Sequence, residues 1–258
     1  MNIGLIGYGK MGCLLEERLL EKGHVVTAMV DPFALCISLG TPFYATLEEA
    51  IGSELKKVDA VFEFTHPDSA AENLLLLARE KIPVVCGTTG WFDKLPEVSR
   101  AVETAGSSLV WSSNFSLGVN LFYRIASNAA KLMDTFEEYD VAGFETHHNQ
   151  KADSPSGTAK TLVEKVLAQM TRKKKAVYDT LDRKPAGDEL HYASLRVGSV
   201  PGTHSLIFDS VADSIEIVHS ARSREGFAAG AVLAAEWLCS KKRTGVFTVD
   251  DVLADMLP

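Results

Sequence analysis

The chain begins with Asn2-Ile3-Gly4-Leu5-Ile6-Gly7-Tyr8-Gly9-Lys10-Met11-Gly12, a short apolar run followed by Gly-x-Gly-x-x-Gly. From Met11 to Leu19 the apolar residues recur with helical spacing, and Gly23 is suited to end that helix. A second run rich in β-branched residues then leads to Asp31. A strand, a glycine turn, a helix, a second strand and a terminal acid in this order are typical of a dinucleotide-binding α/β unit.

The three glycines have separate physical roles in such a unit. Gly7 allows a tight turn, Gly9 lets the backbone approach a pyrophosphate, and Gly12 lets the helix pack closely on the strand. The helix N-terminus then faces the phosphates, with Tyr8, Lys10 and Met11 completing the loop. A glycine turn of purely structural use would explain the glycines, but it would not explain Asp31, which lies about 20 residues beyond them, where a ribose-binding acid is expected.

The alternation of strands and helices continues through the first half. Residues 58–64, 82–86 and 108–111 are predicted to be strands and residues 68–80 a helix, which indicates a Rossmann-type, doubly wound parallel sheet. In such a sheet the ligand lies beyond the carboxyl ends of the strands. We therefore expect the cofactor side to include Phe64, Thr65, Gly87, Thr88, Thr89, Ser112, Ser113, Asn114 and Phe115. Taken alone, Gly87 and Gly90 could be ordinary turn glycines, but the neighbouring motifs favour the cofactor role.

The pattern changes beyond Asn114. A long helix over 117–133, a strand over 140–146 and a helix after Gly157 precede three extended segments, at 192–197, 205–211 and 215–218. This order indicates a second, α+β domain with a mixed or antiparallel sheet. The basic run Arg172–Lys175 is predicted to be a solvated end of the helix that follows Gly157.

A cluster of ionisable residues opens the segment from His147 to Thr158. Two imidazoles, at His147 and His148, precede the amine of Lys151, and the Ser-Gly-Thr sequence that follows is suited to a helix N-terminus. Imidazole changes charge near neutral pH, lysine supplies a positive charge or a proton, and unpaired helix N–H groups bind carboxylates. Consecutive strand residues point to opposite faces, so the two histidines are poorly placed to share a metal ion, and no metal is predicted.

The same segment carries a specific resemblance. His-His-x-x-Lys-x-Asp-x-Pro-Ser-Gly-Thr-Ala, from His147 to Ala159, resembles the signature of the dihydrodipicolinate reductase family. Four further segments resemble that family in the same order, so that the match spans nearly the whole chain. They are Gly7 to Gly12, Phe64-Thr65-His66-Pro67, Gly87-Thr88-Thr89-Gly90, and Ser113 to Asn120.

The resemblance implies NAD(P)H-dependent reduction of 4-hydroxy-tetrahydrodipicolinate, with loss of water, in diaminopimelate and lysine biosynthesis. It implies that His147 and Lys151 supply the proton. His148, Lys151 and the N–H groups of Gly157 and Thr158 are suitable receptors for the dicarboxylate substrate.

The resemblance also implies a domain plan and an assembly. The helical stretch 226–239 and the tail 249–256 return to the first domain, giving a dinucleotide-binding domain of residues 1–116 plus 226–258. Residues 117–225 form a substrate-binding and oligomerisation domain, and relatives of this kind are homotetramers.

The residues around Asp31 predict that NADH is used at least as well as NADPH. The carboxylate can accept the ribose hydroxyls of NADH, whereas it would repel the 2′-phosphate of NADPH. After Asp31 there is no lysine or arginine before Lys56, which leaves Lys10 as the nearby cation. Asp31 could instead only cap the turn before Pro32.

Composition limits the class of protein. The 258 residues are 46% hydrophobic and 23% charged, as in ordinary globular proteins, and the net charge of −8 argues against nucleic acid as a partner. No apolar run reaches transmembrane length, and the first strand leaves no room for a signal peptide, which predicts no membrane partner and a cytoplasmic location. The four cysteines have no metal-binding spacing, and we expect buried, reduced thiols at Cys13, Cys36, Cys86 and Cys239.

Two other classes of protein stay open. A different Rossmann oxidoreductase, of the aspartate or homoserine dehydrogenase type, would explain the glycine motif but not the segment 147–158. A non-catalytic dinucleotide-binding regulator would be expected to lack the proton donor, yet His147 and Lys151 are both present. The segment Arg196 to His204 could contact substrate or form only a hairpin.

Overall fold

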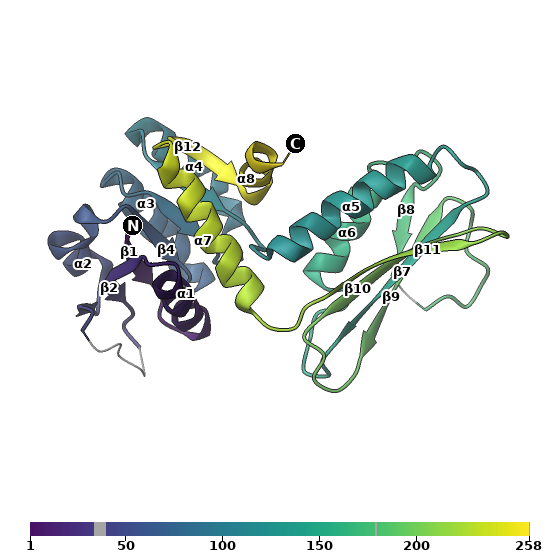
Figure 1. Ribbon diagram of the computed structural model, residues 1–258, viewed down its shortest axis with the longest axis horizontal. Helices are drawn as coiled ribbons and strands as arrows, with labels where there is room; N and C mark the ends of the chain where they lie inside the picture. Colours follow the sequence, from purple (N-terminus) through teal and green to yellow (C-terminus); the bar gives the residue numbers. More distant parts are fainter. Residues whose placement is uncertain (34–39, 179, 258) are drawn as a thin grey trace. The chain divides into compact units, whose positions relative to one another are not determined.

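The computed structural model describes residues 1–33, 40–178 and 180–257, and the chain folds as two compact units (Figure 1). The first unit contains Met1–Leu117 and Arg224–Pro258, and the second contains Gly118–Ser223. The predicted domain boundaries differ from these by one residue at the first junction and by two at the second.

The first unit is built on a seven-stranded parallel sheet with the order β12-β6-β5-β4-β1-β2-β3. The strands are β1 (Asn2–Ile6), β2 (Val25–Val30), β3 (Phe43–Tyr44), β4 (Ala60–Glu63), β5 (Val84–Cys86), β6 (Ser108–Trp111) and β12 (Gly245–Thr248). The strand order reverses between β1 and β4, so the chain leaves these neighbouring strands in opposite directions and opens a crevice at their carboxyl ends. This arrangement confirms the predicted Rossmann-type sheet.

Helices cover both faces of this sheet. They are α1 (Lys10–Glu21), α2 (Leu47–Ser53), α3 (Pro67–Arg79), α4 (Leu95–Ala105), α7 (Glu225–Ser240) and α8 (Val249–Met256), with short 3₁₀ turns η1 (Leu55–Lys57) and η2 (Phe92–Lys94). Leu15 of α1 and Ala231 of α7 belong to one buried cluster, whereas Leu74 of α3 and Val98 of α4 belong to another. The sequence pattern predicted α1, α3 and α7, but it did not predict α2, α4, α8, β3 or β12.

The second unit contains a mixed five-stranded sheet with the order β11-β10-β7-β9-β8. Its strands are β7 (Asp140–His147), β8 (Lys175–Val177), β9 (Glu189–Arg196), β10 (Thr203–Asp209) and β11 (Ser214–Ser220). The pairs β7–β9 and β8–β9 are parallel, and β10 is antiparallel to both β7 and β11. The predicted mixed sheet is therefore confirmed.

Two helices, α5 (Leu117–Met133) and α6 (Gly157–Leu167), cover one face of the mixed sheet (Figure 1). Phe122 and Leu162 from these helices share a buried cluster with Tyr192 and Leu206 from the sheet. On the opposite face, Leu195 and Val218 are more than half exposed. The apolar stripe of the helices thus fixes which face of β7 points inward.

Two expectations about individual residues were wrong. Helix α6 ends at Leu167, before the basic run, and Lys173 is buried, donating to the carbonyls of Gly187 and Glu189, because β8 joins the sheet there. Cys13 is exposed on α1, whereas Cys86 is buried and Cys239 is partly buried. All three are free thiols, and Cys36 lies outside the described residues. None of the described helices is long and apolar enough to cross a membrane.

The packing around Gly143 in β7 yields a stability prediction. A Cβ there would lie 2.6 Å from the carbonyl oxygen of Ser205 and 2.6 Å from the Tyr192 ring. We expect Gly143→Ala to lower the free energy of unfolding by about 1–3 kcal/mol, as overpacking does. The matched control is Gly187→Ala, where the added Cβ meets nothing within 4 Å. Equal urea midpoints for the two variants would contradict the packing argument.

Candidate functional site

The glycine loop between β1 and α1 has the geometry that a phosphate cradle needs. Gly7 has a φ of +90°, and a Cβ there would lie 2.1 Å from the Phe64 carbonyl oxygen. A Cβ at Gly12 would lie 2.5 Å from the Gly7 carbonyl oxygen, so this glycine allows the close approach of helix and loop. Gly9, at the start of α1, borders open space. The uncapped helix N-terminus is therefore accessible, which fits a pyrophosphate.

Asp31 is held in place at the end of β2. Its Oδ2 accepts the Tyr8 N–H at 2.7 Å, and its Oδ1 accepts the Phe33 N–H at 2.8 Å. The second bond is the turn cap that the sequence allowed as an alternative, and the first ties the acid to the glycine loop. Each carboxylate oxygen keeps a further lone pair, so the cap and a ribose contact are compatible.

Two cavities lie at the carboxyl ends of the strands. The larger, about 810 Å³, is lined by residues that include Gly7, Gly9, Asp31, Phe64 and Thr65. The smaller, about 230 Å³, is lined by Met11, Phe64, Gly87, Ser112, Ser113, Asn114, Phe115, Arg224 and Phe227. Phe64 borders both cavities, and most of the predicted cofactor residues are thereby brought together.

The remaining predicted cofactor residues are placed differently. The Tyr8 side chain is buried and bonded to Glu16, so that only its backbone serves the loop. Thr88 is buried, and its Oγ1 accepts the Thr65 N–H at 2.8 Å, which makes it a support for the neighbouring turn. Lys10 begins α1 and is exposed, and Thr89 is exposed beside Thr88.

The sequence reading missed the α3 side of the larger cavity. His66, Ser69, Glu72, Asn73 and Arg79 all line it. The helical spacing of Ser69, Glu72 and Asn73 could have indicated this face, since α3 follows β4 directly. Arg79 is the most consequential of them, because it adds a cation to a cavity for which only Lys10 had been considered.

In the second unit, His147 is the last residue of β7 and is buried. Its Nδ1 lies 3.4 Å from Glu145 Oε2, an ion-pair distance outside hydrogen-bond geometry. Burial lowers the pKa of the imidazole, and the positive charges of Lys151 and Arg196 lower it further, whereas Glu145 raises it. His148 follows the strand and is partly exposed.

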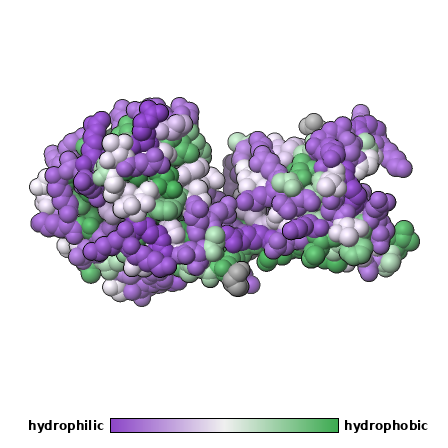
Figure 2. Space-filling model, turned by 90° about the horizontal axis from the view of Figure 1, so that it is seen from above, coloured by the Kyte–Doolittle hydropathy of each residue, from purple (hydrophilic) through white to green (hydrophobic). Residues whose placement is uncertain are grey.

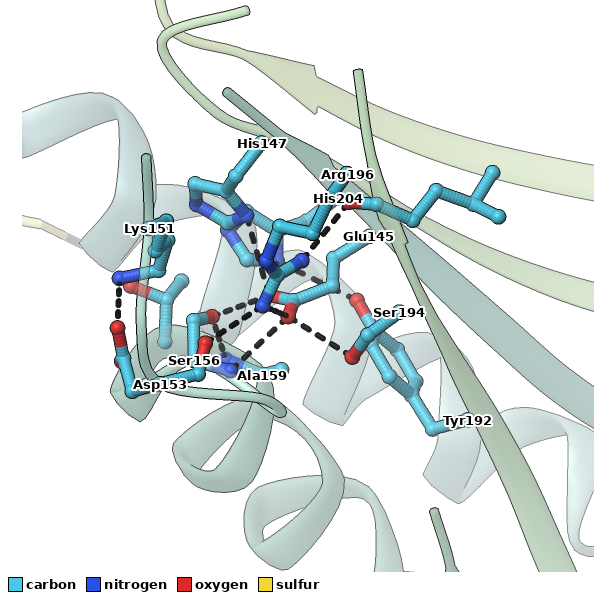
Figure 3. A network of polar contacts seen from close by, with 12 residues as sticks. Glu145, His147, Lys151, Asp153, Ser156, Ala159, Tyr192, Ser194, Arg196 and His204 are labelled. Atoms are coloured by element: carbon cyan, nitrogen blue, oxygen red, sulfur yellow. Dashed lines mark hydrogen bonds and ion pairs between the residues drawn. The ribbon is translucent and has the colours of Figure 1, made fainter. Parts of the chain in front are cut away.

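Glu145 is the hub of the network around His147 (Figure 3). Its fully buried carboxylate accepts the Ser156 N–H at 2.9 Å, the Ser156 hydroxyl, the Ser194 hydroxyl at 2.9 Å and Arg196 Nη2 at 3.2 Å. Burial alone would raise the pKa of this carboxyl, but the hydrogen bonds from Ser156 and Ser194 outweigh burial and lower it. Glu145 is therefore a stable negative charge beside His147.

Lys151 lies on the loop that follows His148 (Figure 3). Its Nζ forms a 2.7 Å ion pair with Asp153 Oδ1, and this contact lowers the pKa of the aspartate. The Lys151 side chain is about one-fifth exposed, at 22%. A partly exposed ammonium with one carboxylate partner can exchange that partner for an arriving anion.

The N-terminus of α6 offers further N–H groups of the kind that can bind an anion. The Ser156 hydroxyl accepts the Ala159 N–H at 3.1 Å, and the Ser156 carbonyl accepts the Lys160 N–H at 3.0 Å. Among the described residues, the first-turn N–H groups of Gly157 and Thr158 are left for a ligand. A Cβ at Gly157 would meet nothing within 4 Å, so there is room beside them.

The segment Arg196 to His204 is part of this network. Arg196 Nη2 also donates to the Asp153 carbonyl at 2.6 Å, and the His204 ring lies edge-on to His147, with centroids 5.2 Å apart. A Cβ at Gly202 would lie 3.0 Å from His147 Nε2. The segment joins β9 to β10, which lie on either side of β7 and do not pair with each other, so it crosses the end of β7 and encloses His147. The alternative that it forms only a hairpin is therefore wrong.

Glu145, His147 and His204 each offer a possible metal ligand atom, and these atoms lie within 4.8 Å of one another. The sequence reading had considered only the pair His147 and His148. The Glu145 oxygens already accept four hydrogen bonds, and a cation would lie beside the charges of Arg196 and Lys151. The arrangement therefore favours a hydrogen-bonded network.

Sequence reasoning missed Glu145 and Ser194 as members of this network, and it left the role of the segment from Arg196 to His204 open. A signal existed for one of them, because Glu145 lies two positions before His147 and so shares its strand face. The other members come from β9 and β10, and their pairing with β7 is set by the sheet register.

Comparison with known proteins identifies the family. The sequence profile of the N-terminal part of dihydrodipicolinate reductase matches residues 1–115, and that of the C-terminal part matches residues 118–253. The 4-hydroxy-tetrahydrodipicolinate reductase of Christiangramia forsetii is 38% identical over 258 residues, with 99% of each chain covered. That of Chromobacterium violaceum is 38% identical, with 98% of each chain covered.

Solved structures agree on the fold. A dipicolinate-bound dihydrodipicolinate reductase from Paenisporosarcina sp. TG-14 superposes with a TM-score of 0.81 at 22% identity, covering 96% of this chain and 97% of that one. A probable dehydrogenase from Thermotoga maritima gives a TM-score of 0.63 at 11% identity, covering 98% and 92%. Both family profiles match, in chain order, across the two units that the structure separates, and the chain belongs to the dihydrodipicolinate reductase family.

Proposed function

We propose that this protein reduces 4-hydroxy-tetrahydrodipicolinate to tetrahydrodipicolinate, consuming one NAD(P)H and one proton and releasing NAD(P)⁺ and water. Membership of the family supports the reaction, and the Glu145–His147–Lys151 network beside the α6 N-terminus is the observation that supports the site. An oxidoreductase of the aspartate or homoserine dehydrogenase type would account for the glycine loop but not for this network in the second unit. That alternative is therefore not favoured.

The first unit is proposed to bind the dinucleotide, which supplies the hydride. Gly9 and the α1 N-terminus would receive the pyrophosphate, and Asp31 would accept the ribose hydroxyls. Phe64 and Gly87 are proposed to line the inner end of the site, where a Cβ on Gly87 would lie 2.2 Å from the Phe64 ring. Gly87 is thus required for the ring position, which goes beyond an ordinary turn glycine.

The second unit is proposed to bind the dicarboxylate and deliver the proton. The N–H groups of Gly157 and Thr158 would bind one carboxylate, and Lys151 and His148 would bind the other. Hydride addition makes the ring negative, and His147 and Lys151 are the groups that can neutralise it with a proton. Burial lowers the pKa of His147, so the imidazole gains its proton most readily once the substrate anion is beside it.

Removing either proposed proton donor should slow turnover. We expect His147→Gln and Lys151→Ala each to lower kcat by about 10²-fold or more, because general acid catalysis contributes on that order. Dinucleotide affinity, measured by fluorescence titration, should be unchanged. Suitable controls are His191→Gln in β9 and Lys160→Ala on the exposed side of α6. Near wild-type turnover in both test variants would overturn the assignment.

NADH should be used at least as well as NADPH, because Asp31 opposes the 2′-phosphate. Arg79 and Lys10 are the cations that would limit this preference. Steady-state kcat/KM values for the two cofactors test the proposal, and Asp31→Ala should narrow the difference, unlike the exposed control Asp68→Ala. A kcat/KM for NADPH about tenfold above that for NADH, or 1.4 kcal/mol, would show that Asp31 does not govern the choice.

We also propose that the protein is a cytoplasmic homotetramer that assembles through the mixed sheet. Phe144, Ala193 and Val218 lie on one face by ladder register, and Leu195 and Ile207 extend that face. Leu195 is 53% exposed and Val218 51%. On the face shown in Figure 2, hydrophobic residues gather along one edge of the second unit. An open apolar sheet face is a typical surface for self-association.

Charge on this open face should prevent assembly. We expect Val218→Asp to convert the tetramer into smaller species, as measured by light scattering with size-exclusion chromatography, because burying an unpaired carboxylate in the interface is costly. Val211→Asp, at a fully exposed position before β11, is the control. A wild-type chain that is monomeric at micromolar concentration would refute the proposed assembly.

A further inference from the structure

The buried carboxylate of Glu145 has no role in the reaction as proposed so far. It lies in the middle of the site without contacting an assigned anion receptor directly, and it is completely inaccessible to solvent. A buried charge of this kind is costly unless it is paired and hydrogen-bonded. Its retention at such a position therefore needs a reason beyond the stability of the sheet.

Glu145 connects the two halves of the substrate site. On one side its oxygens accept both the N–H and the hydroxyl of Ser156, the residue that caps α6. Because the serine hydroxyl has a single proton and donates it to Glu145, its lone pairs are oriented toward the Ala159 N–H. The carboxylate thereby fixes the N-terminus of α6, where the N–H groups of Gly157 and Thr158 are proposed to bind a ligand.

On the other side Glu145 faces the Nδ1 edge of His147, at 3.4 Å. The opposite nitrogen, Nε2, lies beside Gly202, where a Cβ would be only 3.0 Å away, so that glycine is needed for the ring to occupy this position. A carboxylate at Nδ1 orients an imidazole ring and stabilises its protonated form, leaving Nε2 as the donating nitrogen. Ser194 and Arg196 hold the carboxylate from the β9 side (Figure 3).

We infer that Glu145 is a positioning residue that orients His147 for proton delivery through Nε2 and couples that orientation to the anion-binding end of α6. The inference rests on the proposed role of His147. Glu145 does not contact the reacting atoms, and it acts through His147 and Ser156.

The charged groups around His147 define the expected pH behaviour. Glu145 in β7 raises the pKa of the imidazole, as does Asp153 on the loop, whereas Lys151 and Arg196 lower it. His204 in β10 is uncharged at neutral pH, because burial lowers its pKa to about 4. If protonated His147 is the active form, kcat/KM falls as pH rises through its pKa. Loss of the Glu145 charge moves this fall to lower pH, and loss of the Arg196 charge moves it to higher pH.

The test compares Glu145→Gln with Glu189→Gln. Glu189 is also a buried carboxylate of the mixed sheet, but it is bonded to Arg183 and Lys175. In Glu145→Gln the amide nitrogen must meet one of the donors from Ser156, Ser194 or Arg196, so kcat at pH 7 should fall by about tenfold or more and KM for the dicarboxylate should rise. The alkaline fall of kcat/KM should move to lower pH. Glu189→Gln should keep the wild-type pH profile, and dinucleotide binding should be unchanged in both.

If Glu145→Gln does not fold, Arg196→Met provides a second test. It leaves the Glu145 carboxylate in place and should move the alkaline fall of kcat/KM to higher pH. His147→Gln distinguishes the proposed role of His147 from the inferred role of Glu145. If the alkaline fall persists in His147→Gln, the proposed role of His147 fails. If it disappears there but does not move in Glu145→Gln or Arg196→Met, the role of His147 stands and the inference about Glu145 is overturned.

Discussion

The buried charge of Glu145 is the constraint on which the second unit's site depends. A carboxylate with no solvent contact must be surrounded by donors, and here they come from the loop before α6 and from β9. Meeting that requirement brings Ser156, Ser194 and Arg196 to one point, although they are far apart in sequence. The positions of His147 and the α6 N-terminus follow from the same contacts.

The proposed anion receptors of the two units differ in kind. In the first, the receptor is backbone: Gly7 and Gly12 allow the close backbone contacts of the turn, and Gly9 leaves open space beside the helix N-terminus. In the second, the backbone receptor at Gly157 and Thr158 is combined with side-chain cations, among them Lys151. A pyrophosphate needs mainly close approach, whereas a substrate that also receives a proton needs groups that titrate.

This difference explains how much the sequence could predict. The glycine loop is local, so its strand, turn, helix and Asp31 were all readable within residues 2–31, and helix α5 was predicted with its observed bounds. The mixed-sheet class followed from strand spacing. The Glu145 network could not be read in this way, because Ser194 and Arg196 reach Glu145 only through the parallel pairing of β7 with β9. Arg79 was missed for a related reason, since it lines the cavity from the far end of α3.

The proposed site combines positive and negative side chains around His147, and their opposite effects on the pKa of the imidazole give a physical reason for both. The proposed dianionic substrate requires cations, and Lys151 is proposed to supply one, but Lys151 and Arg196 both lower the pKa of the imidazole that is proposed to carry the proton. Glu145 offsets this effect from the Nδ1 edge of the ring, opposite the Nε2 edge that lies beside Gly202. Because Glu145 is buried and hydrogen-bonded to Ser156, it remains charged. It also does not compete with the substrate carboxylates for Lys151. A solvent-exposed acid such as Asp153 cannot raise the pKa of His147 without also competing with the substrate. It is paired directly with Lys151, the cation that is proposed to bind an arriving anion.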